Sequence, residues 1–232
     1  MVSDKGYRGV VIQLWKNFSD IETEDNTITV KAGALLSKVA AEALEESLTG
    51  MEFASGIPGT MGGAVMMNAG AYGGEMKDII REVTVLTREG ELLTLSKEEM
   101  NFGYRTSVVK EKGYVVISAE LQLRKGDREE IRKVMDELKE RRVTKQPLDM
   151  PSAGSTFKRP EGYFAGKLIM DAGLRGFSVG GAQISEKHCG FVVNKGDATA
   201  ADVLGLIGEV QKRVQEKFGV ALEPEVKFLG EF

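Results

Sequence analysis

The sequence predicts an α+β fold made of two units. Strand-like and helix-like segments follow one another in mixed order, without the regular alternation that builds a doubly wound parallel sheet. The texture of the chain changes at Arg124-Lys125-Gly126, between a strand-rich and a helix-rich part. We therefore expect one domain over residues 1–123 and a second over residues 124–232. With 42% hydrophobic and 28% charged residues, 232 residues suffice to bury a sizeable core.

Local patterns give the expected elements. Runs rich in β-branched residues between turn formers indicate strands, and apolar residues repeating every three or four positions indicate helices. In chain order we expect strands at 10–14 and 28–32, a helix at 34–47, a hairpin of strands at 82–87 and 91–95, a strand at 114–123, a helix at 127–138, a loop at 142–160, helices at 164–172 and 199–218, and a strand at 224–229.

Several of these elements carry their own boundary signals. Asp127 and Glu130 have the spacing of a capping box, while Thr199 and Gly219 suit the start and end of the last helix. In the strand at 114–123, the period of two fixes which side chains share a face. The more polar face is expected to carry Val116, Ser118, Glu120 and Gln122.

Composition excludes several functional classes. The net charge of −4 gives no basic surface for nucleic acid or for an anionic membrane. No apolar run has the length of a membrane span, and the first residues lack the apolar core of a signal peptide, so we expect a cytoplasmic protein. His188 is the single histidine and Cys189 the single cysteine, which argues against a metal cluster and an internal disulfide.

Glycine is the informative excess, with 28 in the chain, and many crowd into residues 54–74. The stretch fits neither the phosphate-binding P-loop pattern nor the Rossmann glycine pattern. Because glycines lack Cβ atoms, the amides of Gly56-Ile57-Pro58-Gly59-Thr60-Met61-Gly62-Gly63-Ala64 could point at a phosphate, and Thr60 adds a hydroxyl donor. A tight turn with purely structural duties explains the same pattern equally well.

Together with Asn68-Ala69-Gly70-Ala71-Tyr72-Gly73, this stretch resembles the flavin-loop signature of the UDP-N-acetylenolpyruvoylglucosamine reductase family. Further similar blocks follow in the family's order. They are Tyr104-Arg105-Thr106-Ser107, Gln146-Pro147, Ala153-Gly154-Ser155-Thr156-Phe157-Lys158, Gly181-Ala182-Gln183-Ile184-Ser185-Glu186-Lys187-His188 and Leu222-Glu223-Pro224-Glu225-Val226. The resemblance covers essentially the whole chain.

The resemblance implies a fold and a cofactor. We expect part of an FAD-binding domain of the vanillyl-alcohol-oxidase type, followed by a smaller α+β substrate-binding domain. FAD would be the cofactor, NADPH the reductant, and a UDP-sugar enolpyruvyl ether the small-molecule substrate. The cofactor-binding residues implied are Gly56, Ile57, Pro58, Gly59, Thr60, Gly62, Gly63, Ala64, Asn68, Gly70 and Ala71.

The family reaction reduces the enolpyruvyl ether to a lactyl ether on the way to peptidoglycan. The resemblance implies that Arg105 stabilises charge at the substrate carboxylate, that Ser155 donates the proton, and that Glu225 assists it. The substrate-binding residues implied are Tyr104, Arg142, Lys145, Lys158 and Arg159.

Each of these residues also has an ordinary interpretation. Arg105 could pair with a surface carboxylate, Ser155 could be a turn serine, and Glu225 an exposed strand residue. Arg142 and Lys145 follow a helical pattern, and basic residues are favoured at the C-terminal end of a helix.

The sequence also departs from the family pattern. The first residues resemble those just after a Gly-x-Gly-Ser-Asn-type loop, so we expect the N-terminal portion of the FAD-binding domain to be lacking. Arg159 stands where many members carry Asn. The alternative to an active reductase is therefore an inactive fragment that cannot retain FAD.

Overall fold

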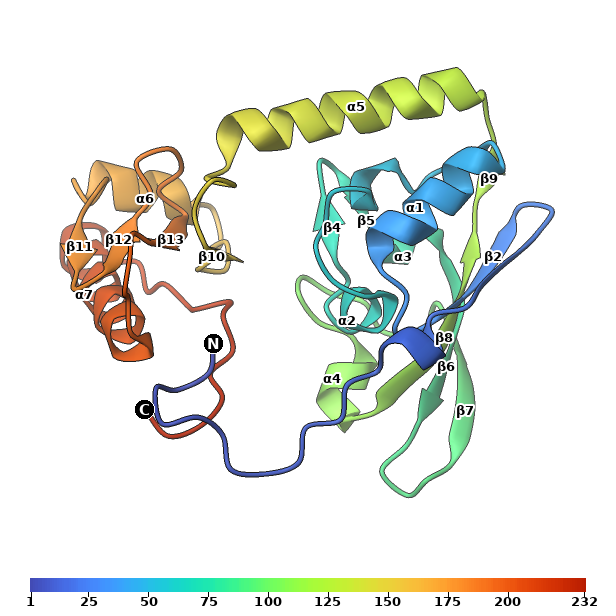
Figure 1. Ribbon diagram of the computed structural model, residues 1–232, viewed down its shortest axis with the longest axis horizontal. Coiled ribbons are helices and arrows are strands. Elements are labelled where there is room, and N and C mark those ends of the chain that lie inside the picture. The colour runs from blue at the N-terminus through green and yellow to red at the C-terminus, as the bar shows by residue number, and fades with distance from the viewer. The chain divides into compact units, whose positions relative to one another are not determined.

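The computed structural model describes all residues 1–232 and divides into two compact units (Figure 1). The larger unit comprises Ile12–Arg142. The smaller unit comprises Met1–Val11 together with Val143–Phe232. The predicted α+β class is confirmed, since both units combine helices with antiparallel strands. A domain boundary at residue 124 stays a prediction.

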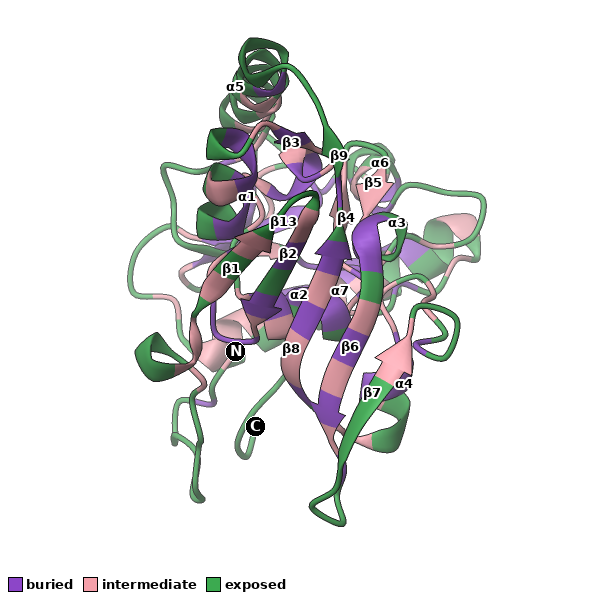
Figure 2. Ribbon diagram, turned by 90° about the vertical axis from the view of Figure 1, so that its right-hand side faces the viewer, coloured by how far each residue is buried: buried purple, intermediate pink, exposed green.

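A five-stranded antiparallel sheet in the order β1-β2-β8-β6-β7 forms the framework of the larger unit. Buried residues alternate along the inner strands, as Figure 2 shows for β2 and β6, because one face of the sheet covers the core. The strands are β1 (Ile21–Glu24), β2 (Thr27–Lys31), β6 (Ile80–Leu86), β7 (Leu92–Ser96) and β8 (Val115–Gln122).

Short elements carry the glycine-rich segment across this core. Helix α2 packs against β8 and β2, so the segment lies on the middle of the sheet. The elements are α1 (Leu36–Glu45), β3 (Leu48–Thr49), α2 (Met61–Met66), β4 (Gly70–Ala71), β5 (Gly74–Glu75), α3 (Met76–Ile79), α4 (Val108–Lys112) and β9 (Arg124–Lys125), with single 3₁₀ turns at Lys16–Phe18 and Glu52–Ala54.

Helix α5 (Arg128–Lys145) leads from the larger unit into the smaller one. The Asp127 carboxylate accepts hydrogen bonds from the amides of Glu129 and Glu130, both at 3.0 Å, which confirms Asp127 as its N-cap. Ile131 is its one buried residue. The helix runs past the predicted end at 138. The predicted loop at 142–160 is therefore partly wrong, because the helix occupies its first residues and residues 152–155 form a strand.

The smaller unit is built on a four-stranded antiparallel sheet in the order β10-β13-β12-β11. Helix α7 buries Leu206, Ile207, Val210 and Val214, and it packs against β11, β12 and α6. The elements are β10 (Ser152–Ser155), α6 (Ala165–Asp171), β11 (Ser178–Val179), β12 (Ala182–Ile184), β13 (Phe191–Asn194) and α7 (Ala200–Phe218). No helix in the chain combines the length and the apolar character needed to cross a bilayer.

Most predicted elements are confirmed. They include the strand at 28–32, the helix at 34–47, the hairpin of β6 and β7, and the helix at 164–172. The last helix begins after Thr199, whose hydroxyl accepts from the Asp202 amide at 3.0 Å, and it ends at Gly219 in the left-handed conformation. These elements rest on local patterns, which sequence alone displays.

Three further predictions are wrong. The segment at 10–14 is not a strand, because no strand pairs with its backbone, and Val10 and Ile12 are 86% and 84% exposed. The segment at 224–229 makes only isolated bridges. Val116 is buried rather than on the polar face, because a register shift between Thr84 and Val85 interrupts the alternation of β8 against β6.

Candidate functional site

The loop before α2 exposes glycine backbone. Gly56, Pro58, Gly59 and Gly63 are exposed. Gly59 has φ +127°, and a Cβ there would meet nothing within 4 Å. A side chain on Gly63 would meet only the Thr60 hydroxyl, at 3.9 Å. This open surface fits a bound group that approaches the backbone closely, as a dinucleotide cofactor does.

Not every amide of the loop is available to such a group. The amides of Met61 and Gly62 donate to the carbonyls of Ala34 and Ala32, both at 2.8 Å, and the Ala64 amide donates to Thr60 at 3.0 Å. These bonds anchor the start of α2 to the β2–α1 connection. The amides that could contact a phosphate are therefore those in the exposed part of the loop. The assignment of individual residues to the cofactor stays a prediction.

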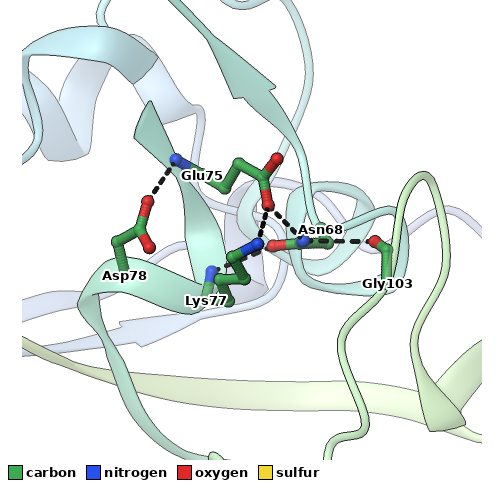
Figure 3. Close-up of polar contacts among 5 residues, drawn as sticks. All are labelled: Asn68, Glu75, Lys77, Asp78 and Gly103. Carbon is green, nitrogen blue, oxygen red and sulfur yellow. Dashed lines mark hydrogen bonds and ion pairs between the residues drawn. The ribbon is translucent and has the colours of Figure 1, made fainter. Parts of the chain in front are cut away.

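Asn68 ends α2 inside a hydrogen-bond network (Figure 3). It is 2% exposed. Its Nδ2 donates to Glu75 Oε2 at 2.9 Å and to the Gly103 carbonyl at 3.1 Å, while its Oδ1 accepts from the Lys77 amide at 2.9 Å. All three bonds of this side chain are made to protein groups. The carboxamide thus links three segments of the larger unit, and the role of Asn68 in cofactor binding stays a prediction.

The Tyr104-Arg105 pair lies at the tip of a two-residue turn. The amide of Gly103 donates to the Thr106 carbonyl at 3.1 Å, and that of Thr106 donates back to Gly103 at 3.4 Å. Arg105 has φ +55°, in the left-handed region that few non-glycine residues adopt. Ser107 is fully buried, and its hydroxyl donates to the Met66 carbonyl at 2.9 Å. The backbone under Arg105 is thus fixed on both sides.

Glu75 is the acidic member of this neighbourhood. Lys77 Nζ lies 2.7 Å from its carboxylate. The hydrogen bond from Lys77 lowers the pKa of Glu75, desolvation opposes it, and the Asn68 bond and the charges of Lys77 and Arg105 lower it further. The carboxylate is therefore ionised at neutral pH and balances part of the positive charge around Arg105.

Arg142 lies against the glycine loop. A Cβ on Gly56 would come within 2.8 Å of Arg142 Nε, so the glycine makes room for this side chain. The guanidinium also lies 5.8 Å from the centroid of the Tyr72 ring. A fixed cation beside the exposed glycines suits an anionic ligand group. Substrate binding by Arg142 stays a prediction, because the side chain lies beside the loop that is predicted to bind the cofactor.

In the smaller unit, Ser155 ends β10 on an irregular strand. The pairing of β10 with β13 shifts between Ser152 and Ser155, and Gly154 has φ +82°. Such a bulge re-aims the side chain that follows it. Ser155 is exposed, and its hydroxyl makes a long 3.4 Å bond to the Phe157 carbonyl.

Glu225 is brought next to this strand. Its amide donates to the Thr156 carbonyl at 2.8 Å, and Pro224 bridges to Phe157. The carboxylate-bearing segment and the Ser155 strand are therefore backbone neighbours, although 70 positions separate the two residues in the sequence. Arg105 belongs to the larger unit, and Ser155 and Glu225 belong to the smaller one.

The remaining predicted substrate residues have varied surroundings. Lys158 forms an ion pair with Glu223 across the two paired segments. The Arg159 guanidinium lies over the Phe164 ring at 4.1 Å, and its Nε donates to the Tyr163 carbonyl at 3.3 Å. Lys145, the last residue of α5, is exposed. The structure holds no group of three or more potential metal-ligating side chains.

Sequence reasoning missed Glu75, Ser107 and Thr156. Thr156 is 1% exposed, and its Oγ1 accepts from the Val192 amide at 3.0 Å. Ser107 and Thr156 stand inside the recognised blocks, so their position was a usable signal. Glu75 had none, because its bond to Asn68 depends on the fold of the intervening turn.

Comparisons with known proteins show the family of the chain. The sequence model of the UDP-N-acetylenolpyruvoylglucosamine reductase C-terminal domain matches residues 146–229, and that of an FAD binding domain matches residues 1–96. A UDP-N-acetylenolpyruvoylglucosamine reductase of Agathobacter rectalis is 61% identical, and the alignment covers 100% of this chain and 78% of that protein. The protein of the same name from Clostridioides difficile is 57% identical, with 100% and 76% covered. The chain belongs to this reductase family.

A solved member of the reductase family supports the fold. The crystal structure of UDP-N-acetylenolpyruvylglucosamine reductase from Thermus caldophilus superposes with a TM-score of 0.77 at 42% identity, covering 89% of this chain and 74% of that one. The predicted family and the flavoprotein class are thereby confirmed. The match at 1–96 contains the glycine loop and Asn68, and the match at 146–229 contains Ser155 and Glu225.

Proposed function

We propose that this chain is an FAD-dependent reductase that uses NADPH to convert UDP-N-acetylglucosamine enolpyruvate to UDP-N-acetylmuramate in the cytoplasm, for peptidoglycan synthesis. The observation that carries the proposal is the pairing of the Ser155 strand with the Glu225 segment, on the matched C-terminal domain. It places an exposed hydroxyl on a strand that is hydrogen-bonded to the segment carrying the Glu225 carboxylate, which suits delivery of one proton.

FAD, once reduced by NADPH, would supply the hydride that adds to one vinyl carbon of the substrate. The exposed glycines around Gly59 would hold it, with Arg142 beside them. Arg105 would bind the substrate carboxylate, because its guanidinium stays protonated and can stabilise the negative charge that develops there. Ser155 would donate a proton to the other vinyl carbon. Glu225 would orient a water molecule or help to return a proton to Ser155.

The first experiment separates cofactor binding from chemistry. The purified chain is mixed with FAD, free cofactor is removed, and the visible flavin absorption is recorded. A retained flavin spectrum that NADPH bleaches, and that the enolpyruvyl substrate restores, supports the proposal. A colourless protein contradicts it and favours the alternative of a fragment that cannot retain FAD.

The second experiment tests the proton donor by half-reactions. In Ser155→Ala, NADPH should still bleach the flavin at the normal rate, whereas reoxidation by substrate should slow by about 10²–10⁴-fold, the usual contribution of a general acid. Ser178→Ala is the matched control, because Ser178 is an exposed serine of the same unit. Equal loss in both half-reactions would contradict the role of Ser155.

A further inference from the structure

Asn68 is hydrogen-bonded to Glu75, Lys77 and Gly103, as Figure 3 shows. We propose that Asn68 and Glu75 are positioning residues that hold the Gly103–Thr106 turn, so that the Arg105 guanidinium is presented in one geometry. This inference rests on the proposed function, in which Arg105 binds the substrate carboxylate.

The first step is the chemistry of Asn68 itself. It is 2% exposed and has φ +43°, a conformation that asparagine tolerates better than most residues. Its Oδ1 accepts from a backbone amide, so its Nδ2 must face the two acceptors, Glu75 Oε2 and the Gly103 carbonyl. The carboxamide therefore has one orientation. Aspartate or leucine could not reproduce this pattern of donors and acceptor.

The second step leads from Asn68 to Arg105. Gly103 is two residues before Arg105, and its carbonyl is fixed by Asn68 Nδ2 at 3.1 Å. Two residues after Arg105, the buried Ser107 hydroxyl donates to the Met66 carbonyl. Met66 and Asn68 both stand at the end of α2, so this one end anchors both sides of the turn. Left-handed backbone at Arg105 needs such support, because it is strained for a non-glycine residue.

The third step is charge. Glu75 holds Asn68 through one carboxylate oxygen, which also pairs with Lys77 at 2.7 Å. The Glu75 amide donates to Asp78 Oδ2 at 2.8 Å, and this capping box fixes the start of α3. The Glu75 carboxylate is therefore fixed in place, and the hydrogen bond that it accepts from the Asn68 carboxamide is charge-assisted. Glu75→Gln, which removes the charge and keeps the shape, should therefore loosen the Gly103–Thr106 turn less than Asn68→Ala, which removes the carboxamide.

The experiment uses the 232-residue chain with Asn68→Ala, Glu75→Gln and Arg105→Ala, singly and combined. We expect Asn68→Ala to lower kcat on the order of 10²-fold and KM to change much less, because misplacing a group that acts in the transition state affects kcat. Glu75→Gln should lower kcat by about tenfold, since it retains an acceptor for Asn68. Glu120→Gln is the matched control, because it removes a carboxylate paired with Arg81 in the same unit.

Two readouts separate positioning from general loss of stability. If Asn68 acts through Arg105, adding Asn68→Ala to Arg105→Ala lowers kcat no further. Hydrogen exchange at the amides of Gly103 and Thr106 should accelerate in Asn68→Ala and in Glu75→Gln, but not in the control Glu120→Gln. Additive losses of kcat, or unchanged exchange in the turn, would overturn the inference.

The remaining outcomes also decide. Should Asn68→Ala not fold, Glu75→Gln gives the same tests with the carboxamide intact. Should Arg105→Ala retain the full rate, the proposed catalytic role of Arg105 fails, and the exchange data still judge whether Asn68 and Glu75 hold the turn.

Discussion

Replacing Thr156 by valine should test what fixes the strand beside Ser155. Thr156 is 1% exposed, and its Oγ1 accepts from the Val192 amide at 3.0 Å. Valine has the same shape, so no cavity forms, but the buried Val192 amide loses its acceptor at a cost of about 1–3 kcal/mol. The added methyl group recovers up to about 0.8 kcal/mol of apolar burial. We therefore expect a net loss of about 0.2–2.2 kcal/mol in the free energy of unfolding.

Urea unfolding followed by circular dichroism measures this loss, and native-state hydrogen exchange locates it. The Val192 amide should exchange faster in Thr156→Val and keep its protection in Thr156→Ser, which retains the hydroxyl. If the protection of Val192 is unchanged in the valine variant, the hydroxyl does not hold β13 and the reasoning is refuted. Under the proposed function, Thr156→Val should also slow substrate reoxidation, because a looser strand at residue 156 would displace the carbonyl that accepts the Glu225 amide.

Three further predictions use other parts of the chain. In urea unfolding, Gly74→Ala should lower the free energy of unfolding by about 1–3 kcal/mol, because the new Cβ would lie 2.7 Å from the Phe53 ring. Gly208→Ala should raise it by about 0.5–1 kcal/mol, because Gly208 lies within α7 and a Cβ there meets open space. Leu206→Ala should cost about 2–5 kcal/mol in urea unfolding, because that side chain is fully buried, and a loss below 1 kcal/mol would contradict its place in the core. Desolvation lowers the pKa of His188, so the unfolded chain binds its proton more tightly; stability should therefore fall as the pH drops through about 6.5, and His188→Asn should remove that slope from the urea midpoints.

The sequence was a good guide where contacts are local. Helix α7 shows its apolar period, its Thr199 cap and its Gly219 stop within one stretch of chain, and the β6–β7 hairpin needs only the Arg88-Glu89-Gly90 turn. The segment at 10–14 shows the limit of such reasoning. Its residues favour a strand, but a strand also requires a paired neighbour, which local composition does not reveal.

The candidate site divides in the same way. The glycine loop and the blocks around Arg105, Ser155 and Glu225 are visible as sequence. The bond from Asn68 to Gly103 joins residues 35 positions apart, and that from Val192 to Thr156 joins residues 36 apart. Neither bond follows from spacing, because each depends on which strands and turns become neighbours. The sequence therefore shows the blocks of the candidate site, but not the hydrogen bonds that hold those blocks in place.

The two supports have a common construction. Arg105 lies at φ +55° and is followed two residues later by the buried Ser107, and Ser155 follows the φ +82° Gly154 and precedes the buried Thr156. In both cases a polar side chain stands on irregular backbone, and a buried hydroxyl nearby ties that backbone to a distant segment. Breaking such a buried hydrogen bond costs stability, and the bond fixes the backbone that carries the neighbouring polar side chain. The two proposed catalytic residues can therefore lie on a loop and at a strand end and still keep a defined backbone geometry.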